Sequence, residues 1–213
     1  MDKHVERSNV AAYENRFVPI AYDVLVASIF TPFGGVTRLR MKAIDLIGVS
    51  NGMRVLEPGC GTGGVTKLLV ARGADVTAVD GSEQMLSRAR RRAPGARFEK
   101  QQLETLDAAG TFDLVLFSFV LHELPRGLRA QALAAGVRSL VPNGRIAVLD
   151  HAVPGSGRFA QAWRGFLMKL EPPSVAECIE RGYDTELEAA GMRVTAHYAL
   201  AGGTAALTIA ERE

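Results

Sequence analysis

The glycine-rich stretch LEPGCGTGG at residues 56–64 holds the residues best placed to bind a ligand. Glycines at 59, 61 and 64 fit the G-x-G-x-x-G pattern of a loop that cradles the phosphates of a dinucleotide. Glycines at 59, 61 and 63 fit a second pattern, in which an acid precedes three glycines at alternate positions. The glycines alone therefore predict a nucleotide-type loop and leave its ligand open.

Two acids help to decide between a dinucleotide and S-adenosylmethionine (SAM). Asp80 closes the next apolar run and could accept both ribose hydroxyls of either ligand. Glu57 would lie close to a negatively charged pyrophosphate, whereas SAM offers it an ammonium and a sulfonium. The charges therefore favour SAM. The plainer alternatives are that the glycines only form a tight turn and that Asp80 only caps a helix.

Two histidines are the candidates for moving a proton. His122 lies in FVLHEL and His151 in LDHAVP, each just after an apolar run that reads as a strand. The carboxyl ends of such strands form the edge where ligands bind in α/β folds. If SAM donates its methyl group, the transfer mainly requires alignment and exclusion of water, and a base is needed only for some acceptors. A structural role at a strand-to-helix turn is the alternative for both histidines.

We expect neither a metal site nor a disulfide framework. The two cysteines and four scattered histidines do not have the spacing of a metal centre. Because the N-terminal residues MDKHVERSNV lack an apolar signal-peptide core, a reducing cytoplasm is the expected location.

The segment after residue 52 alternates strand and helix patterns, as in βαβ units. The expected strands are 53–57, 75–80, 96–100, 112–119 and 145–150, and the expected helices are 65–72, 82–93 and 127–140. A mixed helical region at 155–181 is interrupted by Pro172-Pro173. The last two expected strands, 192–199 and 204–211, lie so close in sequence that they must pair antiparallel.

Length and composition predict one globular domain, residues 1–213. A chain of this length buries roughly 70% of its unfolded surface, and 47% hydrophobic residues with a net charge of +2 are ordinary values. The basic run at residues 88–92 reads as a solvated helix face without a second basic patch, so we expect no nucleic-acid partner.

Residues 1–50 read as a helical lid and residues 51–213 as the ligand-binding core, with a substrate-cap insertion around 152–183. The apolar stretch 17–36 contains Asp23 and two prolines, which argues against a membrane span and leaves peripheral contact with a membrane or a lipidic substrate open.

The chain resembles the class I SAM-dependent methyltransferases, in particular the ubiquinone/menaquinone C-methyltransferases and bacterial phospholipid N-methyltransferases. The resemblance rests on VLEPGCGTGG, VTAVDGSEQML, FDLVLFSFVLHEL and LVPNGRIAVLD. It implies a Rossmann-like α/β three-layer sandwich. The sheet would have seven strands in the order 3-2-1-4-5-7-6 with strand 7 antiparallel, which agrees with the terminal hairpin.

The resemblance also assigns cofactor-binding positions for SAM, which leaves as S-adenosylhomocysteine. They are Glu57, Gly59, Gly61, Gly63, Asp80, Gly81, Met85, Gln102, Leu103 and Phe117. Phe117 would act through its backbone carbonyl. The family usually has a Gly-Asp-Ala type segment where this chain has Gln101-Gln102-Leu103, so we expect rearranged adenine recognition, with an ordinary solvated loop as the alternative.

Aromatic residues are expected to form the acceptor pocket. Tyr13 and Tyr22 come from the N-terminal segment, and Trp163 and Phe166 share one helical face of the insertion. That face could equally pack on the core. A small hydrophobic or lipidic acceptor is favoured, while the methylated atom (C, N, O or S) and the oligomeric state stay open. The alternative functions are SAM binding without transfer and NAD-dependent oxidation.

Overall fold

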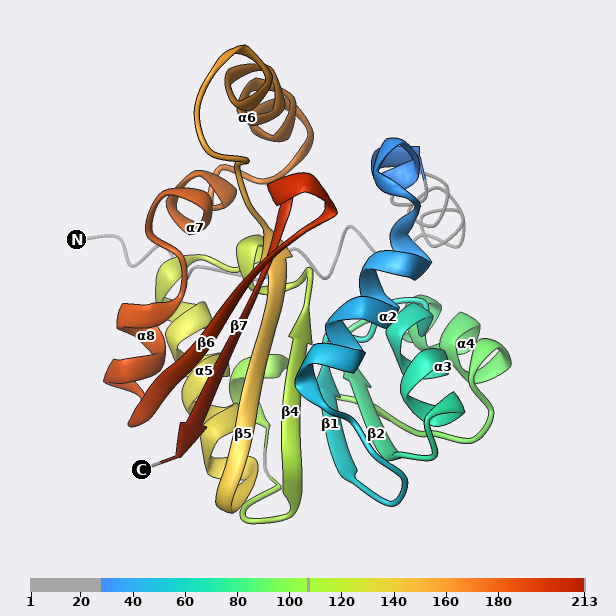
Figure 1. The fold of residues 1–213 in the computed structure, drawn as a ribbon. Coiled ribbons are helices and arrows are strands. Elements are labelled where there is room, and N and C mark those ends of the chain that lie inside the picture. The colour runs from blue at the N-terminus through green and yellow to red at the C-terminus, as the bar shows by residue number, and fades with distance from the viewer. Residues whose placement is uncertain (1–27, 107, 213) are drawn as a thin grey trace, which may run out of the picture.

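The computed structural model describes residues 28–106 and 108–212. The expected acceptor residues Tyr13 and Tyr22 lie outside this part of the chain. Within it, the strands form one seven-stranded sheet in the order β3-β2-β1-β4-β5-β7-β6. Strands β5 and β7 pair antiparallel, as do β6 and β7, and every other pair is parallel. The expected topology is confirmed (Figure 1).

Most element bounds lie close to those expected from the sequence, but β5 begins at Leu140, five residues before the expected strand 145–150. The strands are β1 Arg54–Pro58, β2 Asp75–Asp80, β3 Arg97–Lys100, β4 Phe112–Ser118, β5 Leu140–His151, β6 Met192–Leu200 and β7 Ala205–Arg212. The α-helices are α2 Val36–Ile47, α3 Gly64–Ala71, α4 Glu83–Arg92, α5 Arg126–Ser139, α6 Arg158–Leu170, α7 Val175–Arg181 and α8 Asp184–Ala189. Short 3₁₀ turns are η2 Thr31–Phe33, η3 Leu103–Thr105, η4 Leu121–Glu123 and η5 Ala201–Gly203.

Two apolar cores cover the two faces of the sheet. Alternate strand residues point to opposite faces, so Leu114 packs with the core under α2, α3 and α4, while Val115 packs with the core under α5 and α8. Figure 1 shows these helix layers on either side of the sheet. The result is the expected three-layer sandwich. The helices cover both faces of the sheet, and a ligand site can form at the edge where the carboxyl ends of the strands lie.

Helix α2 belongs to the expected lid, but its buried residues face the core. Leu39, Ala43, Ile44 and Ile47 are buried in the same core as α3 and β1. Gly35 precedes this helix and Gly48 ends it in the left-handed conformation that favours glycine. This described part of residues 1–50 is therefore a packed layer of the sandwich.

No helix within the described part of the chain is long and apolar enough to cross a membrane.

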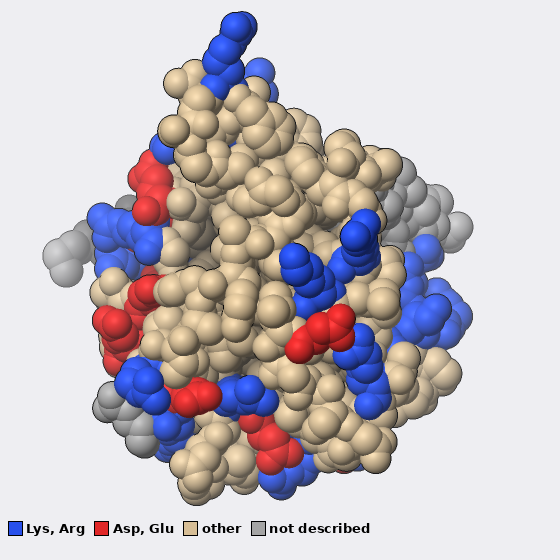
Figure 2. All heavy atoms as spheres, viewed as in Figure 1, with Lys and Arg blue, Asp and Glu red and all other residues tan. Residues whose placement is uncertain are grey.

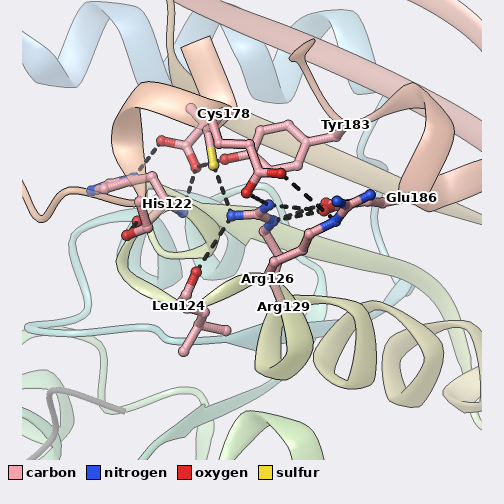
Figure 3. Close-up of polar contacts among 10 residues, drawn as sticks. His122, Leu124, Arg126, Arg129, Cys178, Tyr183 and Glu186 are labelled. Carbon is pink, nitrogen blue, oxygen red and sulfur yellow. Dashed lines mark hydrogen bonds and ion pairs between the residues drawn. The ribbon is translucent and has the colours of Figure 1, made fainter. Parts of the chain in front are cut away.

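A buried arginine on α5 joins that helix to α7 and α8. The Arg129 side chain on α5 is 2% exposed, and its Nη2 lies 2.8 Å from carboxylate oxygens of both Glu177 on α7 and Glu186 on α8. Its Nη1 also donates to the Cys178 sulfur at 3.1 Å (Figure 3). This guanidinium joins three helices, so it fixes where α7 and the segment before it can lie.

Replacing Arg129 by methionine should therefore lower the free energy of unfolding by about 3 kcal/mol, because the partly buried carboxylates of Glu177 and Glu186 lose the guanidinium that pairs with both. Urea denaturation measures this. The matched control is Arg126→Met: Arg126 is 63% exposed and lies 3.6 Å from Glu177, so its loss should cost less than about 0.5 kcal/mol. Equal effects of the two changes would contradict the assigned role of Arg129.

Candidate active site

The glycine loop between β1 and α3 depends on its glycines for steric reasons. Gly59, Gly61 and Gly63 all have positive φ angles of 72°, 53° and 76°, a conformation that L side chains rarely adopt. A Cβ atom at Gly59 would lie 2.4 Å from a methyl carbon of Val120, and one at Gly63 would lie 2.9 Å from the backbone of Ala89. The fold itself requires these glycines, so they are not specific to one ligand.

Asp80, at the end of β2, holds the glycine loop in place. One carboxylate oxygen accepts a hydrogen bond from the backbone N–H of Gly61 at 2.8 Å, and the other accepts from Ser82 at 2.9 Å. Helix α4 itself is capped by the Ser82 hydroxyl. Asp80 therefore supports the glycine loop and the turn before α4 and is not the helix cap.

Glu57 is buried at the end of β1, at 2% exposure. Burial raises its pKa to about 8, although a 2.6 Å hydrogen bond from the Thr66 hydroxyl and the charge of Arg40 oppose this rise. The carboxyl is therefore mostly protonated at pH 7, whereas the sequence argument treated it as an anion. A ligand cation next to it would lower the pKa and restore the charge.

The remaining expected cofactor residues are divided between the loop edge and the core. Gly81 follows Asp80, and the Met85 backbone N–H donates to the Ser82 hydroxyl, which caps α4. Gln102 is partly exposed just before η3. The side chains of Leu103 and Phe117 are buried in the core under α5, so only their backbones can face a ligand.

A buried polar cluster forms at the carboxyl ends of β4 and β5. Nδ1 of His122, from η4, lies 2.6 Å from one Asp150 oxygen, and the Tyr183 hydroxyl donates to the other at 2.7 Å. His122 Nε2 lies 3.3 Å from one oxygen of Glu171, and His151 Nε2 lies 3.4 Å from the other. Both expected histidines are thus brought together, with ring centroids 4.9 Å apart. Figure 3 shows His122 and Tyr183 of this cluster beside the Arg129 contacts.

The charges in this cluster stabilise one another. Burial alone would lower the pKa of His122, but the charge of Asp150 and hydrogen bonds to Asp150 and Glu171 raise it well above its usual value. Burial would raise the pKa values of Asp150 and Glu171, yet the neighbouring histidines lower both. His122 is therefore an imidazolium held between two carboxylates.

His151 differs from His122 in having one ring nitrogen without a partner. Its Nδ1 is buried and makes no hydrogen bond within the described residues. Its ring stacks on Phe30 with centroids 6.2 Å apart and meets Phe119 edge-on at 5.0 Å. Phe119 itself has a φ angle of 53°, a strained conformation for a bulky residue that is typical of functional sites.

The donor types in this cluster would also suit a metal ion. His122, Asp150 and His151 each place one potential ligand atom within 4.8 Å of the others. However, the two Asp150 oxygens already accept from His122 Nδ1, the Tyr183 hydroxyl and the backbone N–H groups of His122 and His151. These hydrogen bonds account for the arrangement without a metal ion.

Two members of the cluster, Glu171 and Tyr183, were not anticipated from the sequence. Glu171 ends a stretch, residues 158–170, that contains no other acid and directly precedes Pro172-Pro173. A lone acid next to a helix-ending proline pair was the available signal. Tyr183 carries no such signal, because its contact with Asp150 depends on how α7 and α8 fold back on β5.

The expected acceptor residues of the insertion occupy different environments. Trp163 is buried, and its indole N–H donates to the backbone carbonyl of Ala152, next to His151, at 2.9 Å. Phe166 lies 5.5 Å from Trp163 between ring centroids but is 40% exposed. Trp163 therefore packs on the body of the protein, while Phe166 faces outward.

We expect Glu57 to give the free energy of unfolding a pH dependence. Because the folded-state pKa of about 8 exceeds the usual 4.5, its stabilising contribution is complete below pH 4.5 and is lost as pH rises through 8. Glu57→Gln should reduce the downward slope by up to about 1.4 kcal/mol per pH unit in this range. Urea titrations between pH 5 and 8 test this, with exposed Glu83→Gln as the control. An unchanged slope would mean that Glu57 is ionised throughout.

Comparisons with known proteins agree with the geometry. Residues 55–144 match a family described as a methyltransferase domain. The chain is 31% identical over 173 residues to an uncharacterised methyltransferase from Synechocystis sp., covering 80% of this chain and 81% of that protein. It is 32% identical over 147 residues to a demethylmenaquinone methyltransferase from Thermus thermophilus, covering 66% of each.

A solved structure shows the same fold. The crystal structure of a SAM-dependent methyltransferase from Aquifex aeolicus matches with a TM-score of 0.66 and 21% sequence identity, covering 88% of this chain and 98% of that one. Together with the relatives above, this identifies the chain as a member of the SAM-dependent methyltransferases.

Proposed function

We propose that this methyltransferase acts on a small hydrophobic acceptor with an acidic hydroxyl on an aromatic ring, and that His151 removes the proton of that hydroxyl. The observation that carries the proposal is the pairing of His151 with Glu171. Nε2 of His151 faces a carboxylate, while its buried Nδ1 has no partner within the described chain.

Glu171 acts on His151 as a positioning residue. A carboxylate at Nε2 favours the tautomer in which Nε2 carries the hydrogen, which leaves the lone pair on Nδ1. In hydrolases a carboxylate orients a histidine base in the same way, with the roles of the two ring nitrogens exchanged. When Nδ1 takes the acceptor's proton, Glu171 stabilises the resulting imidazolium.

His122 fits a positioning role better than that of the base. As an imidazolium it donates toward both Asp150 and Glu171 and has no lone pair left to accept a proton. It holds Glu171 ionised and directed toward His151. Asp150 in turn accepts a hydrogen bond from His122, and the Tyr183 hydroxyl donates to the other oxygen of Asp150.

The proposed cofactor site consists of the residues that the sequence assigned to it. Asp80 would accept the ribose hydroxyls and Glu57 would face the methionyl ammonium. Gly59, Gly61 and Gly63 keep the loop backbone free of side chains, and Gly81, Met85, Gln102, Leu103 and Phe117 would border the adenine and methionyl parts. SAM supplies an electrophilic methyl group on a sulfonium, to be attacked by the electron pair that deprotonation frees on the acceptor.

Aromatic surroundings support a hydrophobic acceptor. Phe30 and Phe119 lie against the ring of His151, and Trp163 is hydrogen-bonded to the next residue, Ala152. The Thermus thermophilus relative is a demethylmenaquinone methyltransferase. On α4, Arg90 contacts Glu83 and Arg92 donates to Thr62. Because these two arginines of the basic run have partners within the protein, they support a small-molecule acceptor over a nucleic acid. We place the reaction in the cytoplasm.

The acceptor class can be tested directly. Purified protein is incubated with methyl-labelled SAM and a bacterial cell extract, which is then fractionated into lipid, small molecules, protein and nucleic acid. We expect label in the lipid and small-molecule fractions. Label confined to protein or nucleic acid would overturn the proposal. It would also be overturned if a demethylmenaquinol analogue is not methylated and the labelled small molecules are all amines or thiols.

With such a hydroxylated acceptor, His151→Gln should lower kcat by roughly 100- to 1,000-fold at neutral pH, the usual contribution of a general base. Activity should recover as pH rises and the acceptor ionises in solution. Glu171→Gln should cause a smaller loss with a similar recovery. His197→Gln is the control, because His197 lies on the edge strand β6 and pairs with Asp184 at the start of α8. A His151 variant with normal kcat and an unchanged pH profile would exclude the base.

Asp80→Ala should weaken SAM binding by about 1–3 kcal/mol, because it removes a hydrogen-bonded carboxylate and the brace of the glycine loop. Calorimetry measures the change. Glu83→Ala, an exposed acid three residues further along the chain, serves as the control and should bind SAM normally. Equal affinity of the two variants would remove Asp80 from the site.

A further inference from the structure

Helix α6 is attached to the rest of the protein along one narrow stripe. Of its 13 residues only Ala160, Trp163 and Leu167 are buried. Their spacing of three and four residues places them on one side of the helix. In Figure 1 the helix stands clear of the sheet beyond the carboxyl ends of the strands. Within residues 28–106 and 108–212 most of its surface is thus exposed, and Phe159 lies 6.2 Å from Phe33 between ring centroids at one end of the helix.

One side of this helix is apolar. Phe159 is 54% exposed, Phe166 is 40% exposed and Leu170 is 37% exposed. These three residues are seven and four positions apart, so they share a single face, which we call the α6 face. Met168 is also 37% exposed but lies nine residues after Phe159, two and a half turns away on the opposite side. Apolar exposure of this kind on one face marks an interaction site.

The charged residues of α6 itself are all positive. Residues 158–170 include Arg158, Arg164 and Lys169 and contain no acid. Arg164 pairs with Glu180 on α7, whereas Arg158 and Lys169 make no ion pair within the described residues. Figure 2 shows this end of the molecule as a mostly uncharged surface with basic side chains and no visible acidic one at its tip.

We propose that the α6 face docks on the surface of a membrane that contains anionic lipids. A helix with an apolar side bordered by lysine and arginine lies at the boundary between headgroups and acyl chains, where both kinds of side chain are satisfied. A second copy of the same face would bring only positive charges together, which disfavours self-association. The surface that complements the α6 face therefore carries negative charge at its outside and apolar groups below. A bilayer with anionic headgroups and acyl chains has both.

The α6 face lies next to the proposed catalytic cluster in sequence and in space. The helix ends at Leu170, and the next residue is Glu171, which contacts both histidines. Trp163 is hydrogen-bonded beside His151. Docking would place the cluster at the lipid surface, from which a lipid-soluble acceptor could enter. This delivery rests on the proposed function, whereas the docking itself does not.

Trp163 provides the readout, because it is the single tryptophan of the chain and lies on α6. The protein is mixed with vesicles of phosphatidylcholine alone or with phosphatidylglycerol added, and binding is followed by co-sedimentation and by quenching of tryptophan fluorescence with brominated lipids. We expect binding and quenching with the anionic vesicles, weakened by salt and by the pair Arg158→Glu and Lys169→Glu.

The decisive comparison is within the helix. Phe159→Ser with Leu170→Ser should reduce vesicle affinity by about tenfold or more, while Met168→Ser on the opposite side should leave it nearly unchanged. Retained SAM binding by calorimetry shows that each variant is folded. The proposal fails if anionic vesicles are not bound, if Met168→Ser is equally damaging, or if the Phe159 and Leu170 changes instead dissolve a dimer seen by sedimentation. None of these readouts requires a methyl acceptor, so failure here leaves the proposed reaction untouched.

Discussion

The arrangement of the active edge depends on the buried carboxylate of Asp150. It lies at the end of β5 and joins segments that are distant in sequence: His122 from the turn after β4 and Tyr183 from the segment before α8. A buried carboxylate is unfavourable unless it is paired and fully hydrogen-bonded. Meeting that requirement fixes the position of η4, orients His122 and, through it, Glu171. Arg129 joins the same insertion to α5 through its contacts with Glu177 and Cys178.

The fold could be predicted from the sequence to a large extent because its signals are local. Ser82 caps α4 as expected, Asp75–Asp80 forms a strand with the expected bounds, and Gly202-Gly203 joins two antiparallel strands. Each of these depends on residues a few positions apart. The seven-strand order came from the family resemblance, since nothing local in β5 specifies which strand will lie beside it.

The site was less predictable because its contacts are distant in sequence. The two histidines were found from their position after apolar strands, yet the sequence could not show that Glu171 would contact both of them. The state of Glu57 was also out of reach, because a burial-raised pKa depends on packing around the end of β1. The glycines carry less information about the ligand than their pattern suggests, because Gly59 and Gly63 are required by the close contacts of Val120 and Ala89 whatever the ligand is.

The differing exposure of the cluster residues has a consequence for how the enzyme would return to its starting state. His122, Asp150 and His151 have side chains that are 3–5% exposed, whereas Glu171 is 17% exposed. On the proposed mechanism a proton captured by His151 stays inside the protein after the product forms. The two carboxylates, the imidazolium of His122 and a newly charged His151 would then be electrically balanced, so this state is stable. Because Glu171 is the most exposed of these four residues, the proton would leave through it, at the end of α6.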